Sequence, residues 1–117
     1  MYKGVGLGGR AYLGEFEQVV LLALARLKGE SYGGAIHQEI LQSTGRDVSI
    51  PAVYVTLKRM EAKGLVASRI GPGGGADGRE TRNYRLLDEG REALARSREL
   101  LERLWDGAGV PSGEGAS

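Results

Sequence analysis

Three stretches of this chain place apolar residues at three- and four-residue steps, the spacing of an amphipathic helix. They cover residues 14–28, 32–44 and 50–63. A glycine follows each of them closely, and glycine readily adopts the left-handed backbone that ends a helix. Two runs typical of strands come next, residues 65–70 and 81–86, on either side of the glycine-rich segment 71–78, and a last helical pattern covers residues 88–106.

A chain of 117 residues with this order of elements is expected to form one domain. Three helices followed by two strands joined at a glycine-rich turn are typical of a winged helix-turn-helix, whose third helix enters the DNA major groove. We therefore expect a mainly α fold with a small β-hairpin. The predicted parts are a flexible arm at 1–12, a winged-helix DNA-binding domain at 13–87, a dimerisation helix at 88–106 and a disordered tail at 107–117.

Three polar residues are suited to begin helices. We expect Ser31 to cap the second helix, Ser49 the third and Asp88 the last, because their side chains can accept hydrogen bonds from free backbone N–H groups. Pro51 falls in the first turn of the third helix, where its missing N–H is harmless.

The composition narrows the function further. The chain has no cysteine, which rules out disulfides and zinc–thiolate sites and fits a reducing cytoplasm. Its longest apolar run, residues 19–25, is far shorter than the roughly 20 residues of a membrane-spanning helix. One histidine and no paired acids in a plausible cleft argue against an enzyme. We expect a cytoplasmic protein without a metal, a cofactor, a catalytic site or a membrane partner.

Two sequence features could each indicate a more specific function than the one we assign to them. Gly4-x-Gly6-x-x-Gly9 has the dinucleotide-binding spacing, but only three residues precede it and no strand can aim it at a helix. The single histidine, His37, falls toward the polar side of the second helix. We interpret it as a solvated surface residue, with a pH switch or a ligand role as the alternative.

The net charge of +1 hides an asymmetry along the chain. Residues 49–87 hold seven Lys or Arg against three Asp or Glu, a net charge of +4, whereas residues 88–117 carry a net charge of −3. The basic excess coincides with the third helix and the hairpin, as expected of a nucleic-acid-binding surface.

The outward face of the third helix is small and apolar at its start and basic at its end. Small residues let a helix enter the major groove and contact thymine methyls, while Lys and Arg contact phosphates. The Tyr54 hydroxyl can reach a phosphate or a base edge. The DNA-binding residues predicted here are Ser49, Pro51, Ala52, Tyr54, Val55, Lys58, Arg59 and Lys63. A solvated basic face on an ordinary amphipathic helix is the alternative.

Four arginines on the hairpin favour the DNA-binding interpretation. They are Arg69, Arg79, Arg82 and Arg85. Arginines gathered on one hairpin repel one another unless a polyanion lies nearby. We expect them to contact the DNA backbone or the minor groove.

The last helix carries a short coiled-coil seam. Leu87, Leu94 and Leu101 are seven apart, and Gly90, Ser97 and Leu104 form a second series offset by three. The first helix is also apolar around much of its circumference, which indicates burial on more than one side. We therefore expect a homodimer. The predicted dimerisation residues are Phe16, Val19, Leu94, Leu101, Leu104 and Trp105.

The sequence resembles the PadR family of bacterial transcriptional regulators over about residues 13–105. The resemblance rests on Leu13-Gly14-Glu15-Phe16-Glu17, on Tyr32-Gly33, on Val53-Tyr54-x-Thr56-Leu57-x-Arg59-Met60-Glu61-x-Lys63-Gly64-Leu65-Val66, on Arg82-x-Tyr84-x-Leu86 and on Glu89-Gly90. One departure is Leu87, where the family often has Thr or Ser as a helix cap.

The resemblance implies a repressor of the short subfamily that dimerises through its last and first helices on a palindromic operator. It implies DNA contacts by Tyr54 and the basic residues of the wing, and in some members release of DNA on binding a small aromatic or drug-like effector. We expect Trp105 to pack the dimer interface, with an apolar pocket for such an effector at this residue as the alternative. A winged helix used only for protein–protein contact, and a regulator of the MarR type, remain alternatives.

Overall fold

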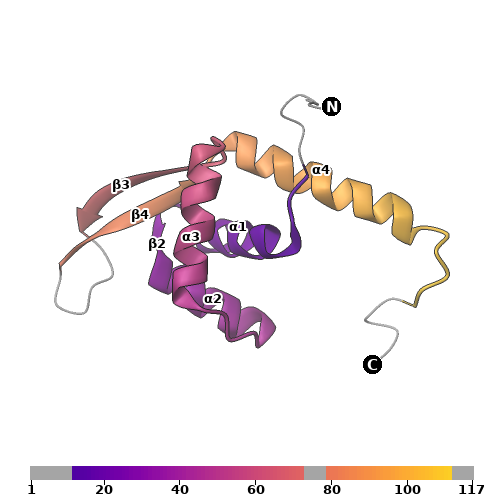
Figure 1. Ribbon diagram of the computed structural model, residues 1–117, viewed down its shortest axis with the longest axis horizontal. Helices are drawn as coiled ribbons and strands as arrows, with labels where there is room; N and C mark the ends of the chain where they lie inside the picture. The colour runs from indigo at the N-terminus through magenta and orange to yellow at the C-terminus, as the bar shows by residue number, and fades with distance from the viewer. Residues whose placement is uncertain (1–11, 73–78, 112–117) are drawn as a thin grey trace.

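The computed structural model describes residues 12–72 and 79–111 (Figure 1). The predicted arm, most of the predicted hairpin tip and the end of the predicted tail lie outside these residues. The elements are α1 (Glu15–Leu27), β2 (Ser31–Tyr32), α2 (Gly33–Thr44), α3 (Ile50–Ala62), β3 (Val66–Pro72), β4 (Glu80–Leu86) and α4 (Asp88–Trp105). This arrangement confirms the predicted winged-helix fold, with four helices and a small antiparallel sheet.

The first three helices and the base of the sheet pack together, and two elements project from them in opposite directions (Figure 1). One is the β3–β4 hairpin, which we call the wing. The other is the second half of α4, which runs away from α1 (Figure 1).

The sheet contains a strand that the sequence pattern did not predict. Its order is β2-β4-β3, with Ser31 opposite Tyr84 and Tyr32 opposite Asn83. The second helix therefore begins at Gly33, one residue later than predicted, and Ser31 does not cap it. Tyr32 holds the cap position in an extended conformation. A two-residue strand is too short to show alternation, but it hydrogen-bonds the edge of β4 that would otherwise stay open.

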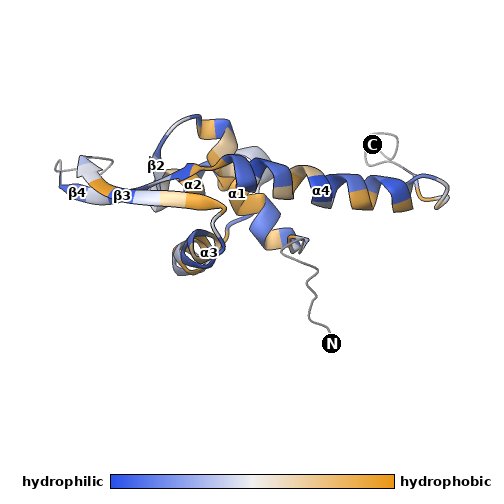
Figure 2. Cartoon of the chain, turned by 90° about the horizontal axis from the view of Figure 1, so that it is seen from above, coloured by the Kyte–Doolittle hydropathy of each residue, from blue (hydrophilic) through white to orange (hydrophobic). Residues whose placement is uncertain are grey.

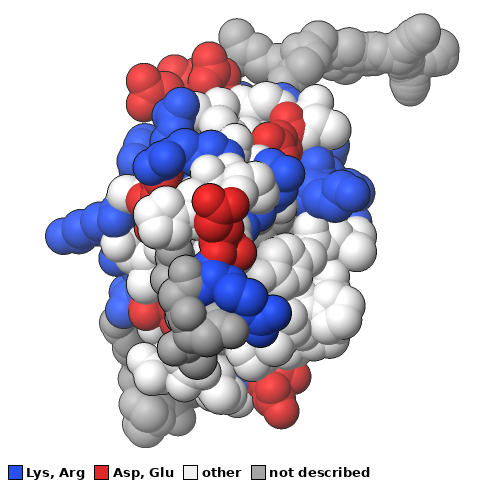
Figure 3. Space-filling view, turned by 90° about the vertical axis from the view of Figure 1, so that its left-hand side faces the viewer, with Lys and Arg blue, Asp and Glu red and all other residues white. Residues whose placement is uncertain are grey.

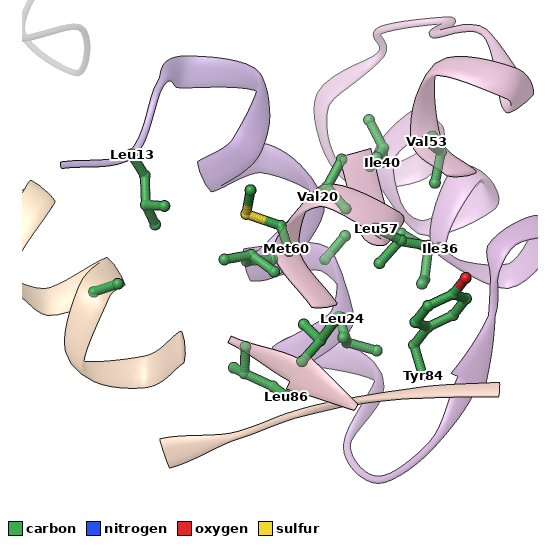
Figure 4. Packing of buried hydrophobic residues seen from close by; sticks show 14 residues of the cluster. Leu13, Val20, Leu24, Ile36, Ile40, Val53, Leu57, Met60, Tyr84 and Leu86 are labelled. Carbon is green, nitrogen blue, oxygen red and sulfur yellow. The ribbon is translucent and has the colours of Figure 1, made fainter. Parts of the chain in front are cut away.

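The core lies where α1, α2 and α3 meet the sheet. Figure 4 shows the side chains of the three helices converging on Tyr84 and Leu86 of β4. The fully buried large residues include Val20, Leu21, Leu24, Ile36, Ile40, Val53, Leu57, Met60, Val66 and Tyr84. Leu13 lies apart from this group, beside α4 (Figure 4).

The start of α4 is held tightly against the rest of the domain. A Cβ atom on Gly90 would lie 2.5 Å from Leu86 Cδ1 and would also collide with the Leu65 carbonyl. One helical turn later and beyond, Ala93 and Ser97 are buried, and the Leu13 N–H donates to Ser97 Oγ at 2.8 Å. Gly90 and Ser97, predicted as part of a seam between subunits, therefore pack within their own chain.

Two further predictions need correction. The cap position of α4 is Leu87, whose side chain makes no capping bond, and Asp88 is the first helical residue. Asp88 and Glu89 instead place negative charge in the first turn, which favours the helix dipole. His37 is not a solvated surface residue, because its side chain is only 15% exposed and its Nε2 lies 2.7 Å from the Val48 carbonyl oxygen. It ties α2 to the segment that leads into α3.

Candidate nucleic-acid interface

The start of α3 is fixed by its predicted cap. Ser49 Oγ accepts a hydrogen bond from the Ala52 N–H at 3.1 Å, which satisfies one of the free N–H groups of the first turn. Val53, Thr56, Leu57 and Met60 are buried and set the rotation of the helix. The opposite side is exposed and carries Pro51, Val55, Lys58, Arg59 and Lys63. This outward face is the one predicted from the sequence.

Tyr54 lies at the shoulder of α3 and is packed against α2. A Cβ atom on Gly33 would collide with the Cζ, Cε1 and Cε2 atoms of the Tyr54 ring. The phenol can therefore occupy this place only because residue 33 is glycine. The half-buried ring is braced at a site where a larger side chain would push it out.

An open pocket of about 500 Å³ separates α3 from the wing. It is lined by Tyr54, Lys58, Glu61, Arg82 and Tyr84. Tyr84 is the most deeply buried of these residues, with only 2% of its surface exposed. Burial, followed by the nearby carboxylate of Glu61, raises the pKa of the Tyr84 phenol above its ordinary value, so this hydroxyl stays protonated.

Two of the predicted phosphate-binding residues of α3 also pair with a carboxylate of the first helix. Glu17 Oε2 lies 3.2 Å from Arg59 Nη2 and 3.9 Å from Lys63 Nζ. Glu17 Oε1 accepts from the Gly14 N–H at 2.9 Å. Burial raises the pKa of Glu17, but the bonds from Gly14 and Arg59 outweigh it and hold that pKa below its usual value. Arg59 and Lys63 therefore connect α3 to α1, although both stay half-exposed.

The four wing arginines lie on different faces of the hairpin. The register pairs Ile70 with Arg82, so Arg82 shares a face with Ser68, Tyr84 and the pocket. Arg69 and Arg85 lie on the opposite face. Arg69 Nε donates to Glu30 at 2.7 Å, a bond that lowers the pKa of Glu30. Arg79 is exposed just before β4 begins.

Basic and acidic side chains alternate over the wing end of the molecule, as Figure 3 shows. The surface is therefore not a uniform positive patch. Within residues 12–72 and 79–111, no group of His, Cys, Asp or Glu is arranged to hold a metal ion. No helix of the described chain is long and apolar enough to cross a membrane.

Sequence reasoning missed several residues at this site. Ile50 and Ile70 are exposed apolar residues at the start of α3 and on the wing, with 45% and 51% of their surface accessible. Three more residues support the predicted DNA-binding side chains: Gly33 lies against Tyr54, and Ser68 bonds to both Arg82 and Glu61. The exposed isoleucines stand out by type, but the supporting residues depend on contacts between distant segments that no local pattern contains.

The predicted dimerisation residues fall into two groups. Phe16, Val19 and Leu94 are partly buried against the core of their own chain. Leu101, Leu104 and Trp105 are 45%, 67% and 55% exposed. Between α1 and α4 runs an open groove of about 560 Å³, whose apolar lining includes Leu22, Leu94, Leu101 and Trp105.

Known proteins are similar to this chain in sequence and in architecture. Residues 20–96 match the Transcriptional regulator PadR-like family. The Transcriptional regulator Rv3488 of Mycobacterium tuberculosis is 42% identical over 77 residues, which span 64% of this chain and 66% of that protein, just under two thirds of its length.

Solved structures agree at the level of the fold. A PadR family regulator from Eggerthella lenta is 29% identical, with a TM-score of 0.64 over 81% of this chain and 83% of that one. A PadR family regulator from Clostridium difficile, 22% identical, gives 0.65 over 80% and 93%. F93 from STIV, described as a winged-helix DNA-binding protein, gives 0.63 at 15% identity over 80% and 95%. The chain belongs to the PadR-like family of transcriptional regulators.

Proposed function

We propose that this protein is a homodimeric, sequence-specific repressor that binds a palindromic operator in double-stranded DNA. In each subunit α3 enters the major groove and the wing contacts the backbone or the minor groove. A regulator of chromosomal genes would work in the cytoplasm. The observation that carries the proposal is the convergence of Tyr54, Lys58 and Arg82 on the pocket between α3 and the wing.

The chemistry of that junction suits a nucleic-acid backbone. Lys58 supplies an ammonium group, Arg82 a guanidinium and Tyr54 a phenolic hydroxyl, and all three are donors suited to phosphate oxygens. The start of α3 carries only short or compact side chains, those of Pro51, Ala52 and Val55. The helix backbone can therefore come close to base edges and thymine methyls. The exposed Ile50 and Ile70 extend the apolar part of the same contact. Arg59 and Lys63 contribute through their exposed portions while they stay near Glu17.

The exposed end of α4 supports the dimer. Leu101, Leu104 and Trp105 form an apolar surface next to Leu22 of α1, where about half of each side chain or more remains accessible. Apolar stripes on a projecting helix are commonly buried against a second copy of the chain. A two-fold dimer would present two α3 helices to half-sites about 34 Å apart on one side of the duplex.

Repression follows from occupancy. A dimer seated on a promoter operator excludes polymerase from that stretch of DNA. Release could come from a planar aromatic ligand in the groove beside Trp105, provided that it binds the DNA-competent and incompetent states with different affinity.

Selection of bound DNA from a random pool tests the proposal most directly. We expect enrichment of a sequence with two-fold symmetry, protected in a footprint over both half-sites. A reporter gene placed behind that sequence should be silenced when the protein is present. If no sequence is enriched, and if the protein passes through a heparin column without retention at any salt concentration, a winged helix used only for protein–protein contact is favoured instead.

A further inference from the structure

Arg82 is anchored differently from Arg59 of α3 and Arg69 of the wing. Arg59 pairs with Glu17 and Arg69 pairs with Glu30 through charged contacts. Arg82 instead bonds to a neutral partner, because its Nη1 donates to Ser68 Oγ at 3.0 Å across the β3–β4 pair. Arg82 is therefore held at the pocket by a hydroxyl, whereas Arg59 and Arg69 are held by carboxylates.

Ser68 is in turn oriented by α3. Its hydroxyl has one hydrogen, and it donates this hydrogen to Glu61 Oε2 at 2.8 Å. The oxygen of Ser68 is thus left to accept from Arg82. Three elements meet in this chain of bonds, with Glu61 on α3, Ser68 on β3 and Arg82 on β4.

The location of Glu61 is unfavourable for simple DNA attraction. Its carboxylate lines the same pocket as Lys58 and Arg82, where a phosphate would approach. A negative charge there repels a polyanion. A positioning role for this acid would offset that repulsion, because an arginine held in place loses less side-chain entropy when it binds.

We propose that Ser68 and Glu61 are positioning residues that hold the Arg82 guanidinium at the pocket between α3 and the wing, ready to contact a DNA phosphate. This inference rests on the proposed function. Ser68 carries the test, because replacing it removes one hydroxyl and no charge.

The test compares three single variants by their affinity for the selected operator. Ser68→Ala should weaken binding about threefold to tenfold, the range expected for one net hydrogen bond. Ser68→Thr keeps the hydroxyl and should stay within about twofold of the wild type. Ser43→Ala is the matched control, because Ser43 also donates to a carboxylate, Glu39, that pairs with an arginine, Arg26, outside the pocket. It should leave affinity unchanged.

Two further measurements separate positioning from general damage. In an Arg82→Ala background, Ser68→Ala should cost nothing more, whereas equal additive losses would overturn the inference. In the free protein, side-chain NMR should show slowed rotation of the Arg82 guanidinium that is lost in Ser68→Ala and kept in Ser68→Thr. Unchanged rotation in Ser68→Ala also overturns the inference, whatever the DNA result. A wild-type protein that binds no DNA but shows this NMR pattern would remove the proposed function alone.

Discussion

The two halves of α4 carry the same apolar stripe and meet different surroundings. In the first half the stripe is made of Gly90, Ala93 and Ser97, which are buried against the chain's own core. In the second half it is made of Leu101, Leu104 and Trp105, which stay exposed although Leu101 and Trp105 border the groove beside α1. Figure 2 shows the apolar bands continuing along the projecting helix between hydrophilic ones.

The residue sizes explain the difference. Small residues let the first half approach the backbone of Leu65 and the side chain of Leu86 closely. Large residues in the second half have no comparable surface within the described chain, and close packing favours a partner that interdigitates with them. One helix therefore serves the fold with small residues and, by our proposal, the assembly with large ones.

The largest effect is expected in the buried half. Ala93→Asp would place a carboxylate where the native residue is 1% exposed, at a cost of about 3 kcal/mol or more, a large part of the stability of a small domain. We expect loss of cooperative unfolding in urea, measured by circular dichroism. Ala95→Asp is the matched control, because Ala95 is exposed on the same helix and should change stability by less than about 1 kcal/mol. Equal destabilisation by both would show that the first half is not packed as described.

The exposed half should respond in its assembly and keep its fold. Leu101→Asp puts charge into the proposed dimer contact, so the monomer should stay folded while sedimentation mass falls from twice the chain to the chain itself. Operator affinity should fall together with the mass by roughly 100-fold or more, because one half-site no longer helps the other. Arg91→Asp, on the exposed side of the first half, should leave the mass unchanged. A wild-type monomer that binds the operator well would refute this architecture.

The sequence predicted a stripe along α4 but not its division into a buried and an exposed half. Leu87, Leu94 and Leu101 repeat every seven residues, as do Gly90, Ser97 and Leu104, and a heptad is the same whether the partner is the same chain or another. The fate of each position depends on where α1 ends in space, which no local pattern contains.

The same reasoning applies to the DNA-facing side. The outward face of α3 followed from periodicity, because helix rotation is set by a local apolar stripe, and the Ser49 cap followed from a side chain that can accept a hydrogen bond at the start of the helix. The split of the wing arginines depends on strand register, and the contact between Gly33 and Tyr54 depends on how α2 crosses α3. Only the tertiary structure supplies these.

A smaller effect is expected from the bond that ties the buried half to the start of α1. Ser97→Ala leaves the Leu13 N–H without its acceptor in a buried place, which should cost about 1–2 kcal/mol in the free energy of unfolding. The urea midpoint should fall with an unchanged slope. Ser97→Thr restores the acceptor but adds a methyl group. Recovery of the midpoint by Thr would show that the hydroxyl matters more than the volume, and loss in neither variant would contradict the bond.

The contact between α1 and α3 next to this bond should be sensitive to pH. Glu17 has a folded-state pKa below its usual value, so its stabilisation is fully present above the unfolded pKa, near 4.5, and is lost as pH falls through the folded pKa. Glu17→Gln should therefore lower stability by about 1 kcal/mol at pH 7 and show a shallower decline below pH 4.5 than the wild type. Parallel acid limbs for the two proteins would mean that Glu17 does not carry this dependence.

The smallest expected signal comes from Trp105, at the end of the exposed half. It is the only tryptophan of the chain and is 55% exposed in the single subunit, so its fluorescence reports on what covers it. Dilution through the dimer dissociation range should shift its emission to the red as water reaches the ring, and Leu101→Asp should be red-shifted at every concentration.

A panel of phenolic and drug-like compounds should quench the Trp105 fluorescence of the dimer if the groove beside Trp105 takes an aromatic ligand. Quenching of the dimer with matching loss of operator affinity would support an effector switch, whereas quenching without that loss would leave a binding site that does not regulate. Emission that changes with neither dilution nor any compound would mean that the exposed half of α4 has no partner at Trp105, and the contrast between the two halves would then need a partner at Leu101 and Leu104 alone.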